Sequence, residues 1–316
     1  MSESESQTDI ARAVGERYRI DRVLGRGGMA TVYLAEDLKH GRQVAIKVMD
    51  PRVGAAIGAH RFLREIEIAA RLTHPHILPL FDSGAAGEQL FYVMPYIAGE
   101  SLRARLEREA RMPIEEAVRL ARDIAGALAH AHARGLVHRD IKPENVLLAE
   151  GIAQVADFGI ARSRSQGTEP AEAVDAERDG RLAVMGQSAS PMDSDPAADA
   201  TRVIDDDVTS GELDLGSGLS TRAGAIIGTP RYMAPEQAMG RSDLDGRADQ
   251  YALGCVLYEL LTGRAPFESQ TFHELVRQHA HEDPPPPSSI RPEVTEALDR
   301  ALSRAMAKSP RIVSPT

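Results

Sequence analysis

Short runs of apolar residues, often alternating with polar ones, fill much of the first hundred residues of the chain. Residues 18–23 and 31–35 have the alternation that is typical of strands, and the glycine-rich residues 24–30 join them. Residues 44–47 also alternate and place Lys47 on the polar side, and residues 92–97 are apolar enough for a buried strand. The pattern predicts a small β-rich region at this end of the chain.

Helical spacing takes over in most of the remaining chain. Residues 61–72 carry apolar side chains three and four positions apart, which predicts a helix with one buried face. Residues 114–134 are predicted to form a longer helix, and residues 251–261 are predicted to form a helix apolar enough to be buried. The expected class is therefore α+β, with strands first and helices afterwards.

The chain has 316 residues and is 42% hydrophobic, which is enough for one large domain or a domain of two lobes. Its single cysteine, Cys255, excludes an internal disulfide and is expected to be an inert core residue. The N-terminus carries serines and glutamates instead of a secretory signal, and no run reaches 18 apolar residues. We therefore expect a cytoplasmic protein without a membrane span, either a soluble protein or a shortened gene product.

Charge is unevenly distributed along the chain. The formal net charge is −10, and residues 163–222 carry 13 Asp and Glu against 5 Arg, which is −8. The remainder is close to neutral and shows no basic surface of the kind that binds nucleic acid. Residues 163–222 also lack aromatic residues and are rich in Ala, Gly, Ser, Asp and Pro, so we expect them to be disordered. A neutral insertion in a tolerant loop would look the same.

Candidate chemistry is concentrated in residues 138–159. The sequence His-Arg-Asp ends at Asp140, Asn145 follows five residues later, and Asp-Phe-Gly begins at Asp157. An aspartate can accept a proton from a hydroxyl, and amide and carboxylate oxygens can hold Mg²⁺. These are the parts that phosphoryl transfer from ATP requires.

The glycine-rich residues 24–30 and Lys47 add a candidate phosphate site upstream. Glycines allow backbone N–H groups to approach phosphates closely. Taken alone, the glycine run is more often an ordinary hairpin turn, and a strand lysine is usually a solvated charge. Their order along the chain, together with the residues near Asp140, favours the functional interpretation.

With these motifs in place, the chain resembles the eukaryotic-type (Hanks-type) serine/threonine protein kinases of bacteria. The resemblance covers about residues 18–308 and includes Val-Ala-Ile-Lys at 44–47, the motifs at 138–159, and Gly-Thr-Pro-Arg-Tyr-Met-Ala-Pro-Glu at 228–236. It implies the bilobal protein kinase fold, with a β-rich N-lobe at about 18–94, a hinge at 95–97 and a mainly helical C-lobe at 98–308. Residues 1–17 would be a flexible N-terminus and 309–316 a short tail.

The resemblance also implies roles for individual residues. Asp140 would be the catalytic base, Lys142 would steady the γ-phosphate, and Asn145 and Asp157 would bind metal. Asp249 resembles the aspartate that holds the backbone near Asp140. ATP, with Mg²⁺ or with Mn²⁺ as its substitute, would occupy a cleft bordered by one group of residues: Leu24, Gly25, Gly27, Val32, Ala45, Lys47, Glu65, Met94, Pro95 and Ile97.

Within that group, Lys47 would contact the α- and β-phosphates and form an ion pair with Glu65. Glu67 is a nearby competitor for this pair, and the family pattern favours Glu65. Pro95 has no N–H, but the hinge uses the carbonyl there and the N–H of Ile97.

Proteins are the implied substrates. Ser220 and Thr221 lie where relatives phosphorylate themselves, and Arg139 would be the natural partner of a phosphate there. Thr201, before an acidic run, is a candidate docking site for a phosphothreonine-binding partner. Homodimerisation through the N-lobe occurs in the subgroup, but no residue here decides it.

Two departures from the family pattern leave alternatives open. Ala30 replaces the third loop glycine, and the chain stops at Thr316, so the partner of Glu236 is in doubt and Arg311 is only a candidate. A small-molecule phosphotransferase and a pseudokinase scaffold remain as competing hypotheses. His74, His76, His130 and His132 are expected to be structural, and residues 103–111 are expected to form a solvated charged face.

Overall fold

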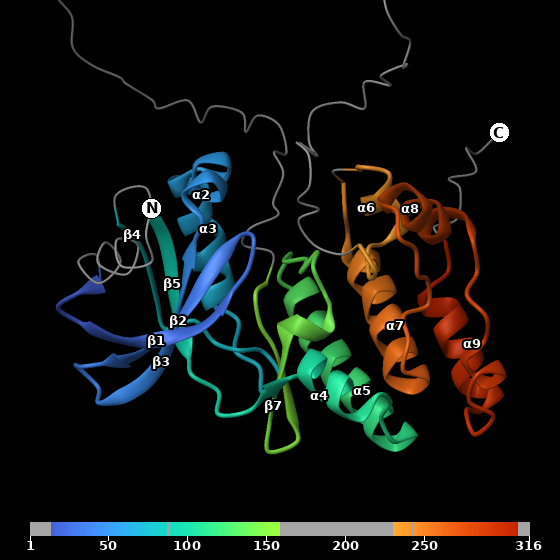
Figure 1. Cartoon of the computed structure of the whole chain (residues 1–316). Coiled ribbons are helices and arrows are strands. Elements are labelled where there is room, and N and C mark those ends of the chain that lie inside the picture. Colours follow the sequence, from blue (N-terminus) through green and yellow to red (C-terminus); the bar gives the residue numbers. More distant parts are fainter. Residues whose placement is uncertain (1–13, 87–88, 159–229, 242, 309–316) are drawn as a thin grey trace, which may run out of the picture. The chain divides into compact units, whose positions relative to one another are not determined.

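The computed structural model describes residues 14–86, 89–158, 230–241 and 243–308 (Figure 1). The expectations for residues 1–13, Gly159, the acidic segment 163–222, Gly228 and Thr229, and the tail after Lys308 lie outside the described residues.

The first described part is a five-stranded antiparallel sheet in the order β1-β2-β3-β5-β4. The pattern at 18–35 and 44–47 correctly predicted its first three strands, and residues 92–95 of the predicted buried strand belong to the fifth. The strands are β1 (Tyr18–Arg26), β2 (Ala30–Asp37), β3 (Arg42–Met49), β4 (Asp82–Ala86) and β5 (Gln89–Pro95).

Helix α3 (Ala59–Ala70) follows the short helix α2 (Pro51–Ile57) and packs against this sheet (Figure 1). Its buried residues Phe62, Ile66 and Ala69 are four and three positions apart, so they share one helical face. Phe62 and Ile66 join Ala45, Leu90 and other sheet residues in one apolar cluster, which explains the spacing seen in the sequence.

The second described part is mainly helical and contains a small sheet in the order β6-β7-β8. The small strands are β6 (Glu100–Ser101), β7 (Val146–Ala149) and β8 (Ile152–Val155), with the 3-10 helix η1 (Pro143–Asn145) before β7. The helices are α4 (Leu102–Glu109), α5 (Ile114–His132), α6 (Pro235–Ala238), α7 (Gly246–Thr262), α8 (Phe272–His281) and α9 (Glu296–Ala305), with the 3-10 helix η2 (Pro287–Ser289) before α9.

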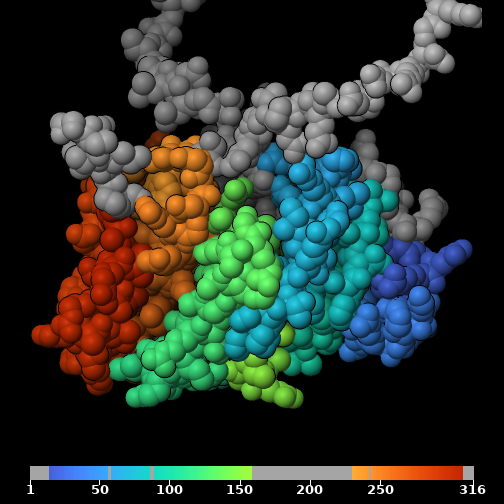
Figure 2. Space-filling view, turned by 180° about the vertical axis from the view of Figure 1, so that it is seen from behind, coloured from blue at the N-terminus to red at the C-terminus, as the bar shows by residue number. Residues whose placement is uncertain are grey.

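Helices α5 and α7 pack directly on each other and contribute many residues to the second core. Their green and orange segments lie side by side on the face that Figure 2 shows. The Asp245 side chain accepts a hydrogen bond from the Arg247 N–H at the start of α7, and Gly263 ends the helix in the left-handed conformation. At the N-terminal end of α7, a Cβ on Gly246 would lie 2.5 Å from the His132 ring, so glycine permits the close approach of the two helices. Cys255 is buried in this core, as expected.

None of the helices in the described part of the chain combines the length and apolar character needed to cross a bilayer.

Lys308 connects the last described residues to α7 and α8. Its Nζ donates to the backbone oxygen of His279 at 2.7 Å and to the Tyr251 hydroxyl at 3.1 Å. The His279 side chain is fully buried, and its Nδ1 lies 2.9 Å from the same hydroxyl. Burial, followed by the positive charge of Lys308, lowers the pKa of His279 to about 4.

We expect this histidine to make the domain sensitive to mild acid. The unfolded chain binds a proton near pH 6.5, whereas the folded chain resists protonation until about pH 4, so stability is lost as pH falls through this window. His279→Asn should remove up to about 3 kcal/mol of that pH dependence in urea unfolding measured at pH 7 and pH 4.5. The exposed His273, on the same helix, gives a matched control in His273→Asn. Equal pH dependence in both variants would contradict the assignment.

Candidate active site

A buried carboxylate fixes the loop that carries Asp140. Asp249, in α7, accepts the His138 N–H on Oδ2 and the Arg139 N–H on Oδ1, each at 2.7 Å. His132 of α5 places its Nε2 2.7 Å from the same Oδ2. Arg139 has a φ of 65°, a left-handed conformation that is uncommon for residues with a side chain. The two hydrogen bonds that Asp249 accepts therefore hold a strained turn in the backbone next to Asp140, where the resemblance implied a brace.

The His138 side chain connects this loop to the strand end that carries Asp157. Its Nε2 lies 2.9 Å from the backbone oxygen of Ala156, and the centroids of the His138 and Phe158 rings are 4.7 Å apart. The Ala156 N–H in turn donates to the backbone oxygen of Asn145 at 2.9 Å. The motifs around Asp140 and Asp157 are thus joined through side-chain and backbone contacts.

Asp140, Lys142 and Asn145 lie together on this loop. Lys142 Nζ is 2.9 Å from Asp140 Oδ2. The Asn145 amide donates to the backbone oxygen of Asp140 at 2.8 Å and to its Oδ2 at 3.2 Å. Because the 3-10 helix η1 turns the chain after Lys142, residues five positions apart meet at one point.

Asp157 receives donors from two strands of the five-stranded sheet. Lys47 Nζ lies 2.6 Å from Oδ2, and the Tyr92 hydroxyl donates to Oδ1. Burial by itself would raise the pKa of Asp157, but the charge and hydrogen bond of Lys47 and the hydrogen bond of Tyr92 outweigh it and lower the pKa. The carboxylate is therefore ionised at neutral pH. Burial, and then the charge of Asp157, raises the pKa of Tyr92 well above its ordinary value.

The predicted ion pair between Lys47 and Glu65 is not formed in this part of the structure. Lys47 is paired with Asp157, while Glu65 accepts a hydrogen bond from Arg61 at 3.2 Å, one turn earlier on α3. An i,i+4 partner on the same helix is available to Glu65 without any movement of the sheet. The competitor Glu67 is paired with Arg71 at the surface.

The residues expected around the adenine are brought together. Ala45 and Met94 are buried in the same apolar cluster that Leu24, Val32 and Ile97 border. Pro95 ends β5 opposite Val44. In the glycine-rich turn, the Gly27 N–H donates to the Ala30 oxygen at 2.9 Å, and nothing lies within 4 Å of the position a Cβ would take on Gly25. This apolar cluster therefore borders the glycine-rich turn, where there is space beside Gly25.

Residues 18–178 and 213–312 match the family described as the protein kinase domain. The chain belongs to this family. Kinase family membership implies the use of ATP and a divalent metal ion, and it confirms the bilobal kinase fold.

Bacterial kinases are among the relatives of this kinase domain. It is 38% identical over 309 residues to "Serine/threonine-protein kinase PknD" of Mycobacterium tuberculosis, covering 96% of this chain and 39% of the relative. It is 33% identical over 315 residues to "Serine/threonine-protein kinase pkn3" of Myxococcus xanthus, covering 95% and 48%. The crystal structure of the Mycobacterium tuberculosis PknI kinase domain matches with a TM-score of 0.62 and 31% identity, covering 93% of this chain and 90% of that one. These relatives confirm the family resemblance, and the chain spans less than half of the two full-length proteins.

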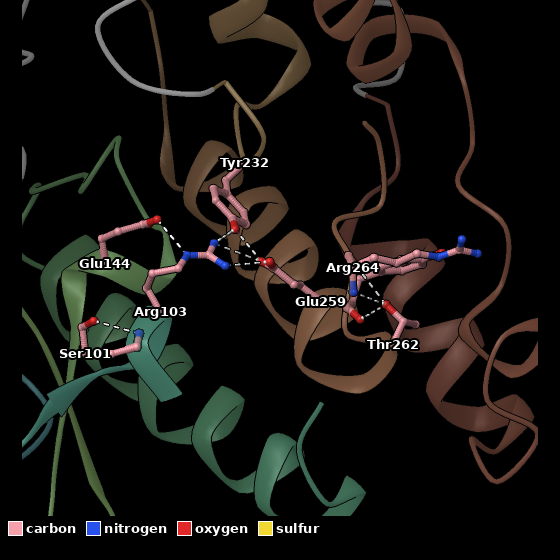
Figure 3. Close-up of polar contacts among 9 residues, drawn as sticks. Ser101, Arg103, Glu144, Tyr232, Glu259, Thr262 and Arg264 are labelled. Carbon is pink, nitrogen blue, oxygen red and sulfur yellow. Dashed lines mark hydrogen bonds and ion pairs between the residues drawn. The ribbon is translucent and has the colours of Figure 1, made fainter. Parts of the chain in front are cut away.

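Arg103 of the kinase domain lies in a polar network that the sequence did not predict (Figure 3). Its guanidinium donates to Glu259 Oε1 of α7 and to Glu144 Oε1 beside Asn145, both at 2.9 Å, and to the Tyr232 hydroxyl. Tyr232 in turn donates to Glu259. The expectation of a solvated face at 103–111 was therefore wrong for Arg103, although Arg108 on the same helix is 55% exposed.

The network is costly to break because Glu259 is buried. The side chain of Glu259 is 6% exposed and that of Arg103 is 21% exposed, so the carboxylate has little access to water. Burial, and then the charge of Glu259, raises the pKa of Tyr232, which keeps this phenol protonated as a donor. Four segments distant in the sequence are held at one point beside the loop of Asp140.

Arg103→Ala should lower the free energy of unfolding by about 3 kcal/mol, because it leaves the carboxylate of Glu259 without its cation. Chemical denaturation followed by circular dichroism measures this change. The control is Arg108→Ala on the same helix, which removes exposed ion pairs with Glu100 of β6 and with Glu109 and should cost at most about 1 kcal/mol. Similar losses in the two variants would contradict a buried role for Arg103.

Proposed function

We propose that the chain is an ATP-dependent protein serine/threonine kinase, which transfers the γ-phosphoryl group of ATP to Ser or Thr hydroxyls of proteins, including its own. The proposal rests on two sets of contacts: Asp140 with Lys142 and Asn145, and Asp157 with Lys47. The hydrogen bonds to the buried carboxylates of Asp249 and Glu259 support them. The family match is consistent with the same chemistry.

Asp140 is assigned the role of catalytic base. Its carboxylate accepts the proton of the substrate hydroxyl while that oxygen bonds to the γ-phosphorus, and the bond to the bridging oxygen of ADP breaks. Lys142, 2.9 Å from Asp140, balances charge on the transferred phosphoryl group. This lysine two residues after the aspartate is the family feature that favours Ser and Thr over Tyr as acceptors.

The donor set fits a magnesium ion. The side-chain nitrogen of Asn145 donates to Asp140, so its side-chain oxygen would be the ligand, and Asp157 would supply an ionised carboxylate. Within the described residues there is no group of three or more His, Cys, Asp or Glu suited to a metal. One carboxylate and one amide are what Mg²⁺ uses when phosphates complete its coordination. When bound, the ion neutralises the developing phosphate charge. We propose Mg²⁺, with Mn²⁺ as its substitute.

The nucleotide is proposed to bind along the glycine turn and the apolar wall. Leu24, Val32, Ala45 and Met94 would contact the adenine, and the backbone at Pro95 and Ile97 would hydrogen-bond it. Gly25 and Gly27 would admit the phosphates. Lys47 would then contact the phosphates and pair with Glu65, which requires it to leave Asp157.

The proposed domain covers residues 18–308, with an insertion near 163–222. The break in the family match between residues 178 and 213 supports that insertion. A phosphothreonine-binding partner docking at Thr201 and a homodimer are further proposals from the resemblance. A cytoplasmic location is proposed because the reaction consumes ATP.

Incubation with Mg-ATP should add phosphate groups to the protein, detected by intact-protein and peptide mass spectrometry. Asp140→Asn should lower the rate about 10²- to 10⁴-fold, because the proton acceptor is lost. Asp21→Asn is a matched control, since Asp21 is exposed on β1. If neither the protein itself nor a generic protein acceptor gains phosphate, the chain is instead a pseudokinase scaffold.

Ser220 and Thr221 are the proposed sites of self-phosphorylation, and they lie outside the described residues. Their joint replacement by alanine should lower activity about tenfold, because a phosphate there would form charge-assisted hydrogen bonds with Arg139. The rate of peptide phosphorylation measures this effect. Replacement of Ser188 and Ser190 by alanine is the control, and equal rates in both double variants would refute the assignment.

A further inference from the structure

The Tyr92 hydroxyl is a polar group in the buried, apolar stretch of β5, and it hydrogen-bonds the carboxylate proposed to hold metal. Tyr92 lies on β5 directly opposite Lys47 on β3, and both side chains reach Asp157. Phe62 of α3 packs against the Tyr92 ring with 6.5 Å between ring centroids. Strand pairing and the α3 contact therefore fix where this hydroxyl lies.

The two oxygens of Asp157 have donors of different accessibility. Oδ1 is bonded to Tyr92, which is 2% exposed, whereas Oδ2 is bonded to Lys47, whose side chain is 20% exposed. The Tyr92 ring is confined by the core, while the lysine has a long chain that can reorient. Oδ2 is thus the oxygen that can exchange its partner, and Oδ1 is the oxygen that stays in place.

We propose that Tyr92 is a positioning residue for the metal ion: its hydroxyl fixes the rotation of the Asp157 carboxylate, so that Oδ2 is presented to the metal when Lys47 moves to the phosphates. The inference rests on the proposed function. A hydrogen bond to a carboxylate ligand sets its orientation, and loss of such a bond commonly weakens metal binding about 10- to 100-fold. The proposed function assigns no role to Tyr92 or to its hydrogen bond with Asp157.

A purely structural role for this hydroxyl predicts a different result. Tyr18 on β1 makes the same kind of bond, with its hydroxyl donating to Asp82 Oδ2 at 3.1 Å, and it is also buried. If Tyr92 only satisfied a buried carboxylate, Tyr92→Phe and Tyr18→Phe would both alter stability, and neither would alter metal binding. The two variants therefore separate folding from metal positioning.

The test measures binding of a fluorescent N-methylanthraniloyl ADP to the full chain, in EDTA and over a series of Mg²⁺ concentrations. In Tyr92→Phe we expect the Mg²⁺ concentration for half-maximal binding to rise about 10- to 100-fold, with affinity in EDTA unchanged. Tyr18→Phe should match the wild type in both. Thermal unfolding without metal confirms that each variant is folded.

An unchanged Mg²⁺ requirement in Tyr92→Phe, beside normal Mg²⁺-dependent binding in the wild type, would overturn this inference and leave the proposed function intact. A lower Mg²⁺ requirement would also overturn it, because the hydroxyl would then compete with the metal. A wild-type chain that binds the nucleotide without any response to Mg²⁺ would overturn both the inference and the proposed function.

Discussion

The buried carboxylate of Asp249 is the interaction on which the proposed active site depends. A buried charge is stable only when it is fully hydrogen-bonded, and here the donors are two consecutive backbone N–H groups and a histidine. Each such bond to a charged group contributes about 1.5–3 kcal/mol, so the two backbone bonds together outweigh the cost of about 1–3 kcal/mol for the left-handed turn at Arg139. Asp140 owes its place to a helix more than a hundred residues further along the chain.

A second buried carboxylate of α7, Glu259, acts on the neighbouring segments in a similar way. Through Arg103 and Tyr232 it joins α4, the residue before Asn145, and the chain that leads into α6. Both carboxylates lie on one helix, with Asp249 in its first turn and Glu259 near its end. A single rigid element thus positions the loop of Asp140 and the segment around Tyr232, which explains why α7 is buried along most of its length.

The sequence predicted much of the fold and the identity of the candidate site. Alternation at 18–35 and helical spacing at 61–72 follow from which residues must be buried, so a single chain reveals them. It did not predict the partners of individual side chains. Lys47 pairs with Asp157 instead of Glu65. Arg103 pairs with the buried Glu259, although it lies on a helix rich in charged residues. These pairs depend on rotamers and on segments 110 and 156 residues apart, which no local pattern encodes. Tyr92 could have been noticed in the sequence, because its hydroxyl is a polar group in a strand that is predicted to be buried.

The pairing of Lys47 with Asp157 has a consequence for how the domain is assembled. In many small metalloproteins the ion is the counter-charge that permits folding, so removal of the metal unfolds the chain. Here the protein provides that counter-charge itself, since a lysine and a phenol satisfy both oxygens of the carboxylate. The charge of Asp157 is therefore compensated within the polypeptide itself, so the burial of this carboxylate between two strands does not depend on a bound cation.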